Sequence, residues 1–185
     1  MAKKPAAYTD KELKIACLDG EPEAQRYLYE SFAGYVYTIC RKYFIPPDYH
    51  KDMMQEIFSE VFMRLQNFKP EKGTLKTWIR NVSVHRVIDY KRKAGRIRDL
   101  ENSAEFVESD EPVIWRQLYL EDFLKTIEPM PDGYRTVFLL SVSKGYSHEE
   151  IGKMLDISKE TSRSQLSRAK NWLRKNISFS KKINS

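Results

Sequence analysis

Residues 145–173 read GYSHEEIGKMLDISKETSRSQLSRAKNWL, and this pattern predicts two short helices joined by a tight turn. Ser147 stands three residues before Glu150, which is the spacing of a capping box at a helix N-terminus. Ser158 is placed to cap a second helix over Lys159–Lys175. Two capped helices joined by about three residues form a helix-turn-helix, the layout that presents its second helix to DNA.

The second of these helices has distinct buried and exposed faces. At about 100° per residue, one narrow stripe is predicted to be buried, and it contains Ser162, Leu166, Ala169 and Leu173. Short polar residues flanked by basic ones lie opposite, which suits a helix in the major groove. An ordinary solvated basic face is the alternative, which the paired caps and the narrow stripe disfavour. The residues expected to contact DNA are Ser158, Lys159, Thr161, Arg163, Ser164, Ser167 and Arg168.

The composition of the 185-residue chain favours an all-α protein. Hydrophobic residues make up 41% of it, enough to bury a core, while Gly is limited to 7 and alternating polar and apolar runs are scarce. The formal net charge of +6 favours a nucleic acid or an acidic surface as partner. Cys17 and Cys40 form no CxxC pair and the 3 His are scattered, so no disulfide framework, metal site or cofactor is expected.

No targeting or membrane-spanning segment is predicted. The N-terminal residues MAKKPAAYTD lack the apolar core of a signal peptide, and no apolar run reaches membrane-spanning length. The protein is therefore expected to be cytoplasmic.

Charge patterning divides the chain into two small helical domains and a linker. Asp99–Pro112 contains six acidic residues and no basic one, directly after a basic run, Lys91–Arg98, that is expected to contact phosphates. Such an abrupt reversal without periodicity is typical of a linker. We therefore predict a helical domain over residues 1–98, an acidic linker over 99–117 and a helix-turn-helix domain over 118–185.

Four helices are predicted in the N-terminal domain. The first is capped near Thr9, the second begins at Pro22, the third spans Asp48–Asn67 and the fourth runs from Thr74 to about Lys93. The third helix has an apolar face that contains Met54, Ile57, Phe58, Val61 and Leu65. Its other face is acidic and suits a basic helical partner, although such a face alone is more typical of plain solvation. That face contains Asp52, Gln55, Glu56, Ser59 and Met63.

The fourth predicted helix mixes aromatic and basic side chains. They are Trp78, His85 and Tyr90 with Arg80, Arg86, Lys91 and Arg92. Aromatic platforms combined with cations hold single-stranded nucleic acid, and opening a duplex requires capture of a base that leaves the stack. The preceding loop, Phe68–Thr74, is expected to take part. A core position is the alternative for Tyr90 and the favoured interpretation for Trp78.

Four segments carry a family resemblance in their order along the chain. They are LDGEPEAQRYLYESF (18–32), DMMQEIFSEVFMRLQNF (52–68), KPEKGTLKTWIRNVSVHRVIDYKRK (69–93) and residues 145–173. Together they resemble bacterial RNA polymerase sigma factors of the extracytoplasmic-function type, over nearly the whole chain. The resemblance implies a protein that is not an enzyme, that binds core RNA polymerase and promoter DNA, and that an anti-sigma protein holds inactive.

The resemblance also implies a role for each set of residues. The third helix would bind core polymerase through Asp52, Gln55, Glu56 and Ser59. The −10 promoter element would be melted and read by Phe68, Lys69, Arg80, His85, Arg86, Asp89 and Arg92. The −35 element would be read by the residues already expected to contact DNA on the helix Lys159–Lys175.

The chain departs from the family pattern at a few positions. Gly152 stands where Ala is usual, Asp156 replaces a turn Gly and Ser162 replaces a Val. These changes predict a less stable helix pair. His85 stands where Asn is common, which leaves the base preference at −10 open.

Two other classes of protein are compatible with parts of the sequence. A stand-alone helix-turn-helix transcription regulator would carry an unrelated N-terminal sensing domain, and the N-terminal motifs argue against it. A metal-dependent enzyme would use Asp52, Glu56 and Glu60, with His50 nearby. No Glu-x-x-His pair, Gly-rich phosphate loop or nucleophile motif supports the enzyme, so no catalytic residue is predicted.

Overall fold

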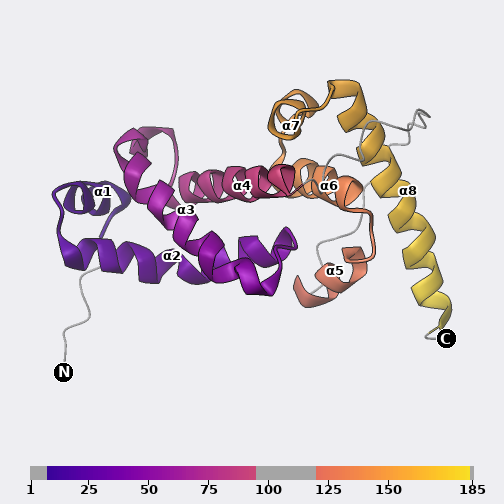
Figure 1. Ribbon diagram of the computed structural model, residues 1–185, viewed down its shortest axis with the longest axis horizontal. Helices are drawn as coiled ribbons and strands as arrows, with labels where there is room; N and C mark the ends of the chain where they lie inside the picture. The colour runs from indigo at the N-terminus through magenta and orange to yellow at the C-terminus, as the bar shows by residue number, and fades with distance from the viewer. Residues whose placement is uncertain (1–7, 95–119, 184–185) are drawn as a thin grey trace. The chain divides into compact units, whose positions relative to one another are not determined.

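The computed structural model describes residues 8–94 and 120–183, so the linker predicted at 99–117 lies outside the described residues (Figure 1). Within these ranges helices are the only regular structure, which confirms the predicted all-α class. None of the described helices combines the length and the apolar character needed to cross a membrane. Tertiary contacts divide the chain into two units, Met1–Val87 and Ile88–Ser185, and each is described by itself.

The first unit is built from α-helices with short 3-10 helices between them. The α-helices are α1 (Asp10–Leu18), α2 (Pro22–Lys42), α3 (His50–Arg64) and α4 (Leu75–Lys93), which belongs to the second unit from Ile88 onward. The 3-10 helices are η1 (Pro47–Tyr49), η2 (Leu65–Asn67) and η3 (Pro70–Lys72). The predicted third helix is therefore a shorter α-helix with a 3-10 turn at each end.

Local signals set the helix ends in this unit. The hydroxyl of Thr9 accepts a hydrogen bond from the backbone N–H of Glu12, whose carboxylate accepts one from the backbone N–H of Thr9. This capping box confirms the predicted start of α1. Pro22 occupies the first turn of α2, where its missing N–H breaks no helical hydrogen bond. That helix ends at Lys42, shortly before Phe44 adopts a left-handed φ of 56°.

The core of the first unit lies mainly between α2 and α3, and α1 packs on α2 and η2. Apolar side chains from both helices are fully excluded from solvent, including Leu28, Val36, Ile57 and Val61. Each contributes about 1.5–3 kcal/mol through burial. The predicted apolar face of α3 is confirmed, except that Met53 is buried where Met54 was expected.

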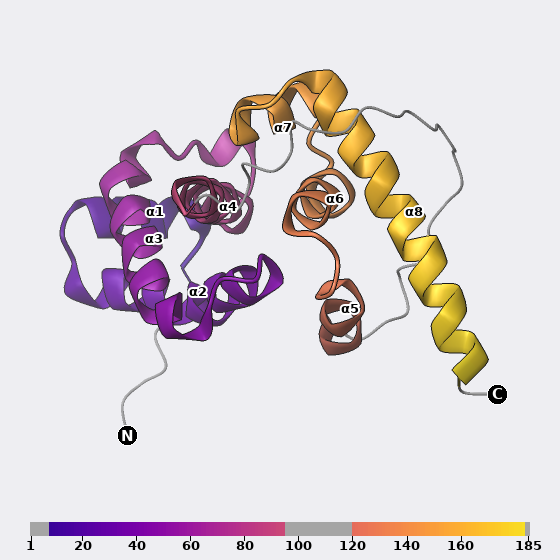
Figure 2. The same ribbon diagram turned by 45° about the vertical axis from the view of Figure 1, so that its right-hand side comes forward.

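The second unit contains α5 (Leu120–Ile127), α6 (Asp132–Lys144), α7 (His148–Leu155) and α8 (Lys159–Ile183). Both α6 and α7 pack against α8 (Figure 2). Pro129 and Pro131 separate α5 from α6, since proline cannot continue a helix. The core includes Ile127, Val137, Leu140, Ile151, Ala169 and Leu173.

The predicted helix-turn-helix is present as α7 and α8. Ser147 and Glu150 form the expected capping box at the start of α7. The hydroxyl of Ser158 accepts a hydrogen bond from the backbone N–H of Thr161 at 2.9 Å, which caps α8. Between them, Asp156 adopts a left-handed conformation, with φ of 58°, that reverses the chain.

Candidate functional site

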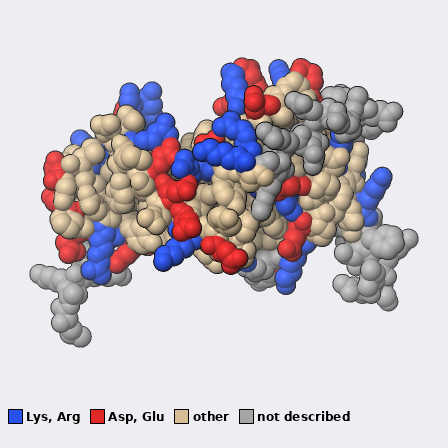
Figure 3. Space-filling model, in the orientation of Figure 1, with Lys and Arg blue, Asp and Glu red and all other residues tan. Residues whose placement is uncertain are grey.

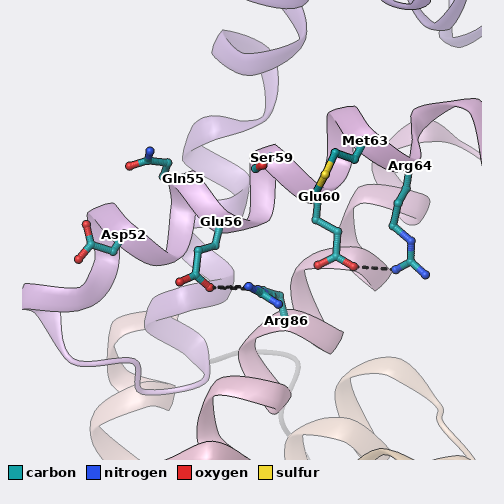
Figure 4. Close-up of a pocket in the computed structure, with 8 residues that line it drawn as sticks. All are labelled: Asp52, Gln55, Glu56, Ser59, Glu60, Met63, Arg64 and Arg86. Atoms are coloured by element: carbon teal, nitrogen blue, oxygen red, sulfur yellow. Dashed lines mark hydrogen bonds and ion pairs between the residues drawn. The ribbon is translucent and has the colours of Figure 1, made fainter.

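The outward face of α3 carries the residues that the sequence predicts to bind polymerase. Asp52, Gln55, Glu56 and Ser59 are all exposed, and all line one groove of about 700 Å³ (Figure 4). The rest of the lining comes from Glu60, Met63, Arg64 and Arg86. On the face shown in Figure 3, acidic side chains form a band over α3. The predicted residues therefore lie together on one surface, which we call the acidic groove.

Two arginines lie at the edge of the acidic groove. Arg86 of α4 places its Nη2 2.9 Å from Oε2 of Glu56, and Arg64 places its Nη1 2.7 Å from Oε1 of Glu60 (Figure 4). The Glu56 side chain is 52% exposed, so its ion pair contributes about 0–1 kcal/mol and can be exchanged for another basic partner. Since Arg86 belongs to the residues predicted to bind −10 DNA, this ion pair joins two predicted surfaces.

A second groove follows the other side of α3. Its volume is about 800 Å³, and aromatic side chains from α2 and α3 dominate its lining, among them Tyr29, Tyr37, Phe58 and Phe62. Gln55 and Ser59 line both grooves, so they form a ridge between an acidic and an aromatic hollow. Sequence reasoning missed this aromatic groove, because only the packing of α2 on α3 brings the tyrosines to the phenylalanines.

The residues predicted to bind the −10 element lie along α4 and in the loop before it. The exposed members are Lys69, His85 and Arg92, and the half-buried members are Arg80, Arg86 and Asp89. Phe68 is only 1% exposed, and its ring centroid lies 5.9 Å from that of Trp78. The prediction that Phe68 contacts DNA directly is therefore wrong for this structure, because its ring belongs to the core beneath the loop.

The C-terminal half of α4 holds several of its polar side chains in internal contacts. Nδ1 of His85 lies 2.7 Å from the carbonyl oxygen of Asn81, and Arg92 forms an ion pair with Asp89 at 3.0 Å. Lys91 is 1% exposed, and its Nζ lies 2.6 Å from Oδ1 of Asp132. The expectation that the basic run Lys91–Arg98 contacts phosphates is thus wrong for Lys91, while residues 95–98 lie outside the described residues.

The residues of α8 predicted to read −35 DNA lie outside its buried stripe. The exposed ones are Ser158, Lys159 and Arg163, and the half-buried ones are Thr161, Ser164, Ser167 and Arg168. The buried stripe contains Ser162, Ala169 and Leu173 as predicted, but Gln165 replaces Leu166, which is only half-buried. The predicted stripe is therefore wrong at that position, and α8 packs against both α6 and α7.

A polar contact inside the helix pair accounts for the buried serine. Ser162 is 0% exposed, and its Oγ lies 2.8 Å from Nδ1 of His148 at the start of α7. Burial lowers the pKa of His148, and the nearby positive charges of Arg163, Lys159 and Lys170 lower that pKa further. The hydrogen bond therefore joins α7 to α8 through a histidine that favours its neutral form.

The described residues offer little for metal or thiol chemistry. Within these ranges, no group of three or more His, Cys, Asp and Glu side chains is arranged to hold a metal ion. Cys17 and Cys40 are both buried, and burial raises the pKa of Cys40 to about 11. A thiol of such high pKa is a poor nucleophile at neutral pH because little thiolate forms.

Comparison with known sequence families matches both units. Residues 28–97 match the family described as Sigma-70 region 2, and residues 120–173 match the family described as Sigma-70, region 4. The first range contains the acidic groove and α4 up to its C-terminal end. The second contains α7 and the part of α8 that carries the predicted −35 residues.

Individual proteins agree with these matches. The chain is 30% identical over 131 residues to the ECF RNA polymerase sigma factor SigE of Mycolicibacterium smegmatis, covering 67% of this chain and 50% of that protein. The chain therefore spans about half the length of that relative. It is 23% identical over 176 residues to the ECF RNA polymerase sigma-E factor of Escherichia coli, covering 88% of this chain and 91% of that one.

Solved structures share the fold. CnrH, solved in complex with the cytosolic domain of CnrY, is similar with a TM-score of 0.50 and 19% identity, over 91% of this chain and 97% of that one. RpoE of Bartonella quintana, solved with the anti-sigma factor NepR, has a TM-score of 0.51 and 19% identity, over 83% of this chain and 96% of that one. Fold and matched regions together define a two-region sigma-70 protein. The chain belongs to the ECF, or extracytoplasmic-function, sigma factors.

Proposed function

We propose that this chain binds core RNA polymerase and directs it to promoters through their −10 and −35 elements. The acidic groove of α3 provides the polymerase contacts, Asp52, Gln55, Glu56 and Ser59. The loop before α4 and the helix itself bind the −10 element through Lys69, Arg80, His85, Arg86, Asp89 and Arg92. The edge of α8 binds the −35 element through Ser158, Lys159, Thr161, Arg163, Ser164, Ser167 and Arg168. Phe68 packs in the core and supports the loop Lys69–Thr74, which we call the −10 loop.

One observation carries this proposal: the acidic groove falls within the range matched to region 2, and the polar and basic edge of α8 within the range matched to region 4. An acidic groove beside an aromatic one suits a helical partner that presents basic and apolar side chains together. Basic and short polar side chains on an exposed helix edge suit phosphates and base edges of the major groove.

The remaining parts of the proposal concern organisation and partners. We propose two domains, residues 1–98 and 118–185, joined by a linker over 99–117, in a cytoplasmic protein that performs no covalent chemistry of its own. An anti-sigma protein is a further proposed partner, because a relative of the same fold was solved bound to an anti-sigma factor. Such a partner would keep the chain inactive by covering its polymerase-binding or DNA-binding surfaces.

In vitro transcription with core polymerase tests the function directly. Genomic DNA fragments are transcribed with and without the full chain, and transcript starts are mapped by sequencing. We expect a set of starts that appears only with the protein and shares −10 and −35 sequences. If the protein produces no new starts but binds particular genomic fragments without polymerase, the stand-alone regulator would be favoured instead.

A matched pair of variants tests the role of α3 in the same assay. Asp52→Lys reverses a charge in the acidic groove, while Glu23→Lys makes the same change on α2 at an exposed position outside it. Only Asp52→Lys is expected to lower the affinity for core polymerase. Equal affinity of the two variants would show that another surface binds polymerase.

A further inference from the structure

Helix α1 holds both ends of the loop that precedes α4. Nζ of Lys14 donates hydrogen bonds to the carbonyl oxygens of Gln66, at 3.0 Å, and Phe68, at 2.6 Å. Oδ2 of Asp10 accepts a hydrogen bond from the backbone N–H of Leu75 at 2.7 Å. Asp10 and Lys14 lie one helical turn apart on α1, so one face of this helix serves both ends of the loop.

These contacts involve backbone groups that helix ends leave without partners. The carbonyl oxygens at the end of η2 lack a donor within their own helix, and the first N–H of α4 lacks an acceptor within its own. Both side chains of α1 are charged, and a charged partner makes a hydrogen bond shorter and stronger than a neutral one. Asp10 also places a negative charge at the N-terminus of α4, where the helix dipole favours it.

The loop between these anchors is open to solvent. Phe68 is buried at its start and Leu75 at its end, whereas Lys69, Glu71, Lys72, Gly73 and Thr74 are exposed. The loop is therefore held at both ends, and the residues between them are exposed to solvent. Its conformation depends on α1, which lies before the residues matched to Sigma-70 region 2.

We infer that α1 positions the −10 loop, with Asp10 and Lys14 as positioning residues for capture of an unpaired promoter base. This inference rests on the proposed function, in which Lys69–Thr74 faces the −10 element. A loop held at both ends keeps its exposed groups in the geometry that discriminates one base from another. Without these hydrogen bonds from α1, the loop still closes but samples several geometries, and discrimination between bases at −10 falls.

The test uses the full chain with core polymerase on a promoter found by transcript mapping. Promoters with each −10 base replaced in turn are scored for opening by permanganate reactivity of unpaired thymines. Lys14→Ala and Asp10→Ala are expected to reduce the preference for the native −10 base by about three- to tenfold, the loss of one or two hydrogen bonds. Lys11→Ala, at an exposed lysine of the same helix, is the matched control and should keep the full preference.

The ratio between native and substituted promoters separates positioning from folding. Loss of folded protein lowers opening of all promoters equally and leaves this ratio unchanged, so an unchanged ratio in Lys14→Ala overturns the inference. Lys14→Arg keeps a donor and should restore the preference. If the unmodified chain opens no promoter with core polymerase, both the proposed function and the inference fail. If it does, and Lys14→Ala discriminates normally, only the inference fails.

Discussion

Gly152, in the middle of α7, has no room for a side chain. A Cβ there would lie 2.8 Å from the carbonyl oxygen of Ile157, a backbone atom that cannot swing aside. Helix propensity alone favours Ala over Gly by about 1 kcal/mol, which is why the sequence predicts a weakened helix pair at this position. The close approach outweighs propensity here. Glycine is the residue that lets the turn after α7 fold back onto the helix.

We therefore expect Gly152→Ala to destabilise the second unit by about 1–3 kcal/mol, the usual cost of forcing atoms into a packed site. Urea unfolding of the full chain, followed by circular dichroism, measures the change. Asp156→Gly is the companion variant, since the φ of 58° at Asp156 is strained for a residue with a Cβ. It should raise stability by up to about 1 kcal/mol. A more stable Gly152→Ala protein would contradict the steric argument.

His148 gives the helix pair a dependence on pH. Because its pKa is lowered in the folded protein, the unfolded chain binds the proton more readily than the folded one. The contribution of His148 to stability should therefore be fully present above about pH 6.5 and be lost as the pH drops through the pKa of His148 in the folded protein. Unfolding free energies measured between about pH 7.5 and 5.5 test this, a range in which Glu150, whose pKa is lowered by its hydrogen bonds to Ser147, stays ionised.

His148→Gln removes the titration while keeping a side chain that forms hydrogen bonds, so it should flatten the pH profile. His85→Gln, at an exposed histidine of the first unit, makes the same substitution outside the helix pair and is the matched control. The same slope in His148→Gln as in the unmodified chain would assign the pH dependence to other groups.

At the scale of the helix, the buried stripe of α8 sets which of its residues are exposed and so available for the proposed −35 contacts. Ala169 and Leu173 fix the orientation of the helix in the second unit, and Arg163 lies outside this stripe and is exposed. Basic side chains beside a helix face in the groove contact phosphates, which every DNA sequence presents alike. The contribution of Arg163 should therefore be electrostatic and not specific to a base.

Arg163→Ala is expected to weaken promoter binding by the polymerase complex about three- to tenfold and to lower the salt dependence by about one counterion. The affinity is measured by fluorescence anisotropy at several salt concentrations, with thermal unfolding as the check on folding. Lys125→Ala removes the same charge from an exposed position on α5 and serves as control. If both variants bind equally well, the proposed −35 contacts of α8 have been assigned wrongly.

At the scale of the whole molecule, unfolding of the helix-turn-helix should leave polymerase binding by the acidic groove intact. Leu173 is 2% exposed in the core of the second unit, and a carboxylate there would lose its hydration without gaining a partner. Leu173→Asp is therefore expected to cost more than about 3 kcal/mol and to unfold the helix-turn-helix. Binding to core polymerase, measured by co-purification, should persist because the acidic groove lies in the first unit.

Arg174→Asp places the same carboxylate at the exposed neighbouring position and is the control for this variant. It should leave helix content unchanged. Loss of polymerase binding together with the helix-turn-helix signal in Leu173→Asp would mean that the two regions depend on each other for folding.

The sequence by itself determined the helices and their caps. Thr9, Ser147 and Ser158 act on backbone groups a few residues away, so their roles follow from spacing alone. The apolar period of α3 likewise assigned its outward face correctly, because one helical turn relates those positions. These local rules were sufficient to predict the all-α fold, while the resemblance to sigma factors rested on four segments that occur in the family's order along the chain.

Tertiary structure alone decided which side chains meet across the chain. Phe68 is buried on Trp78, Arg86 pairs with Glu56, and Gln165 takes the place expected for Leu166 in the core. The hydrogen bonds that Lys14 donates to the loop before α4 join residues more than fifty positions apart. No periodicity encodes such contacts, since they depend on how whole helices pack. The first helix, which the sequence marks only by its cap, thereby gains a role in holding the −10 loop.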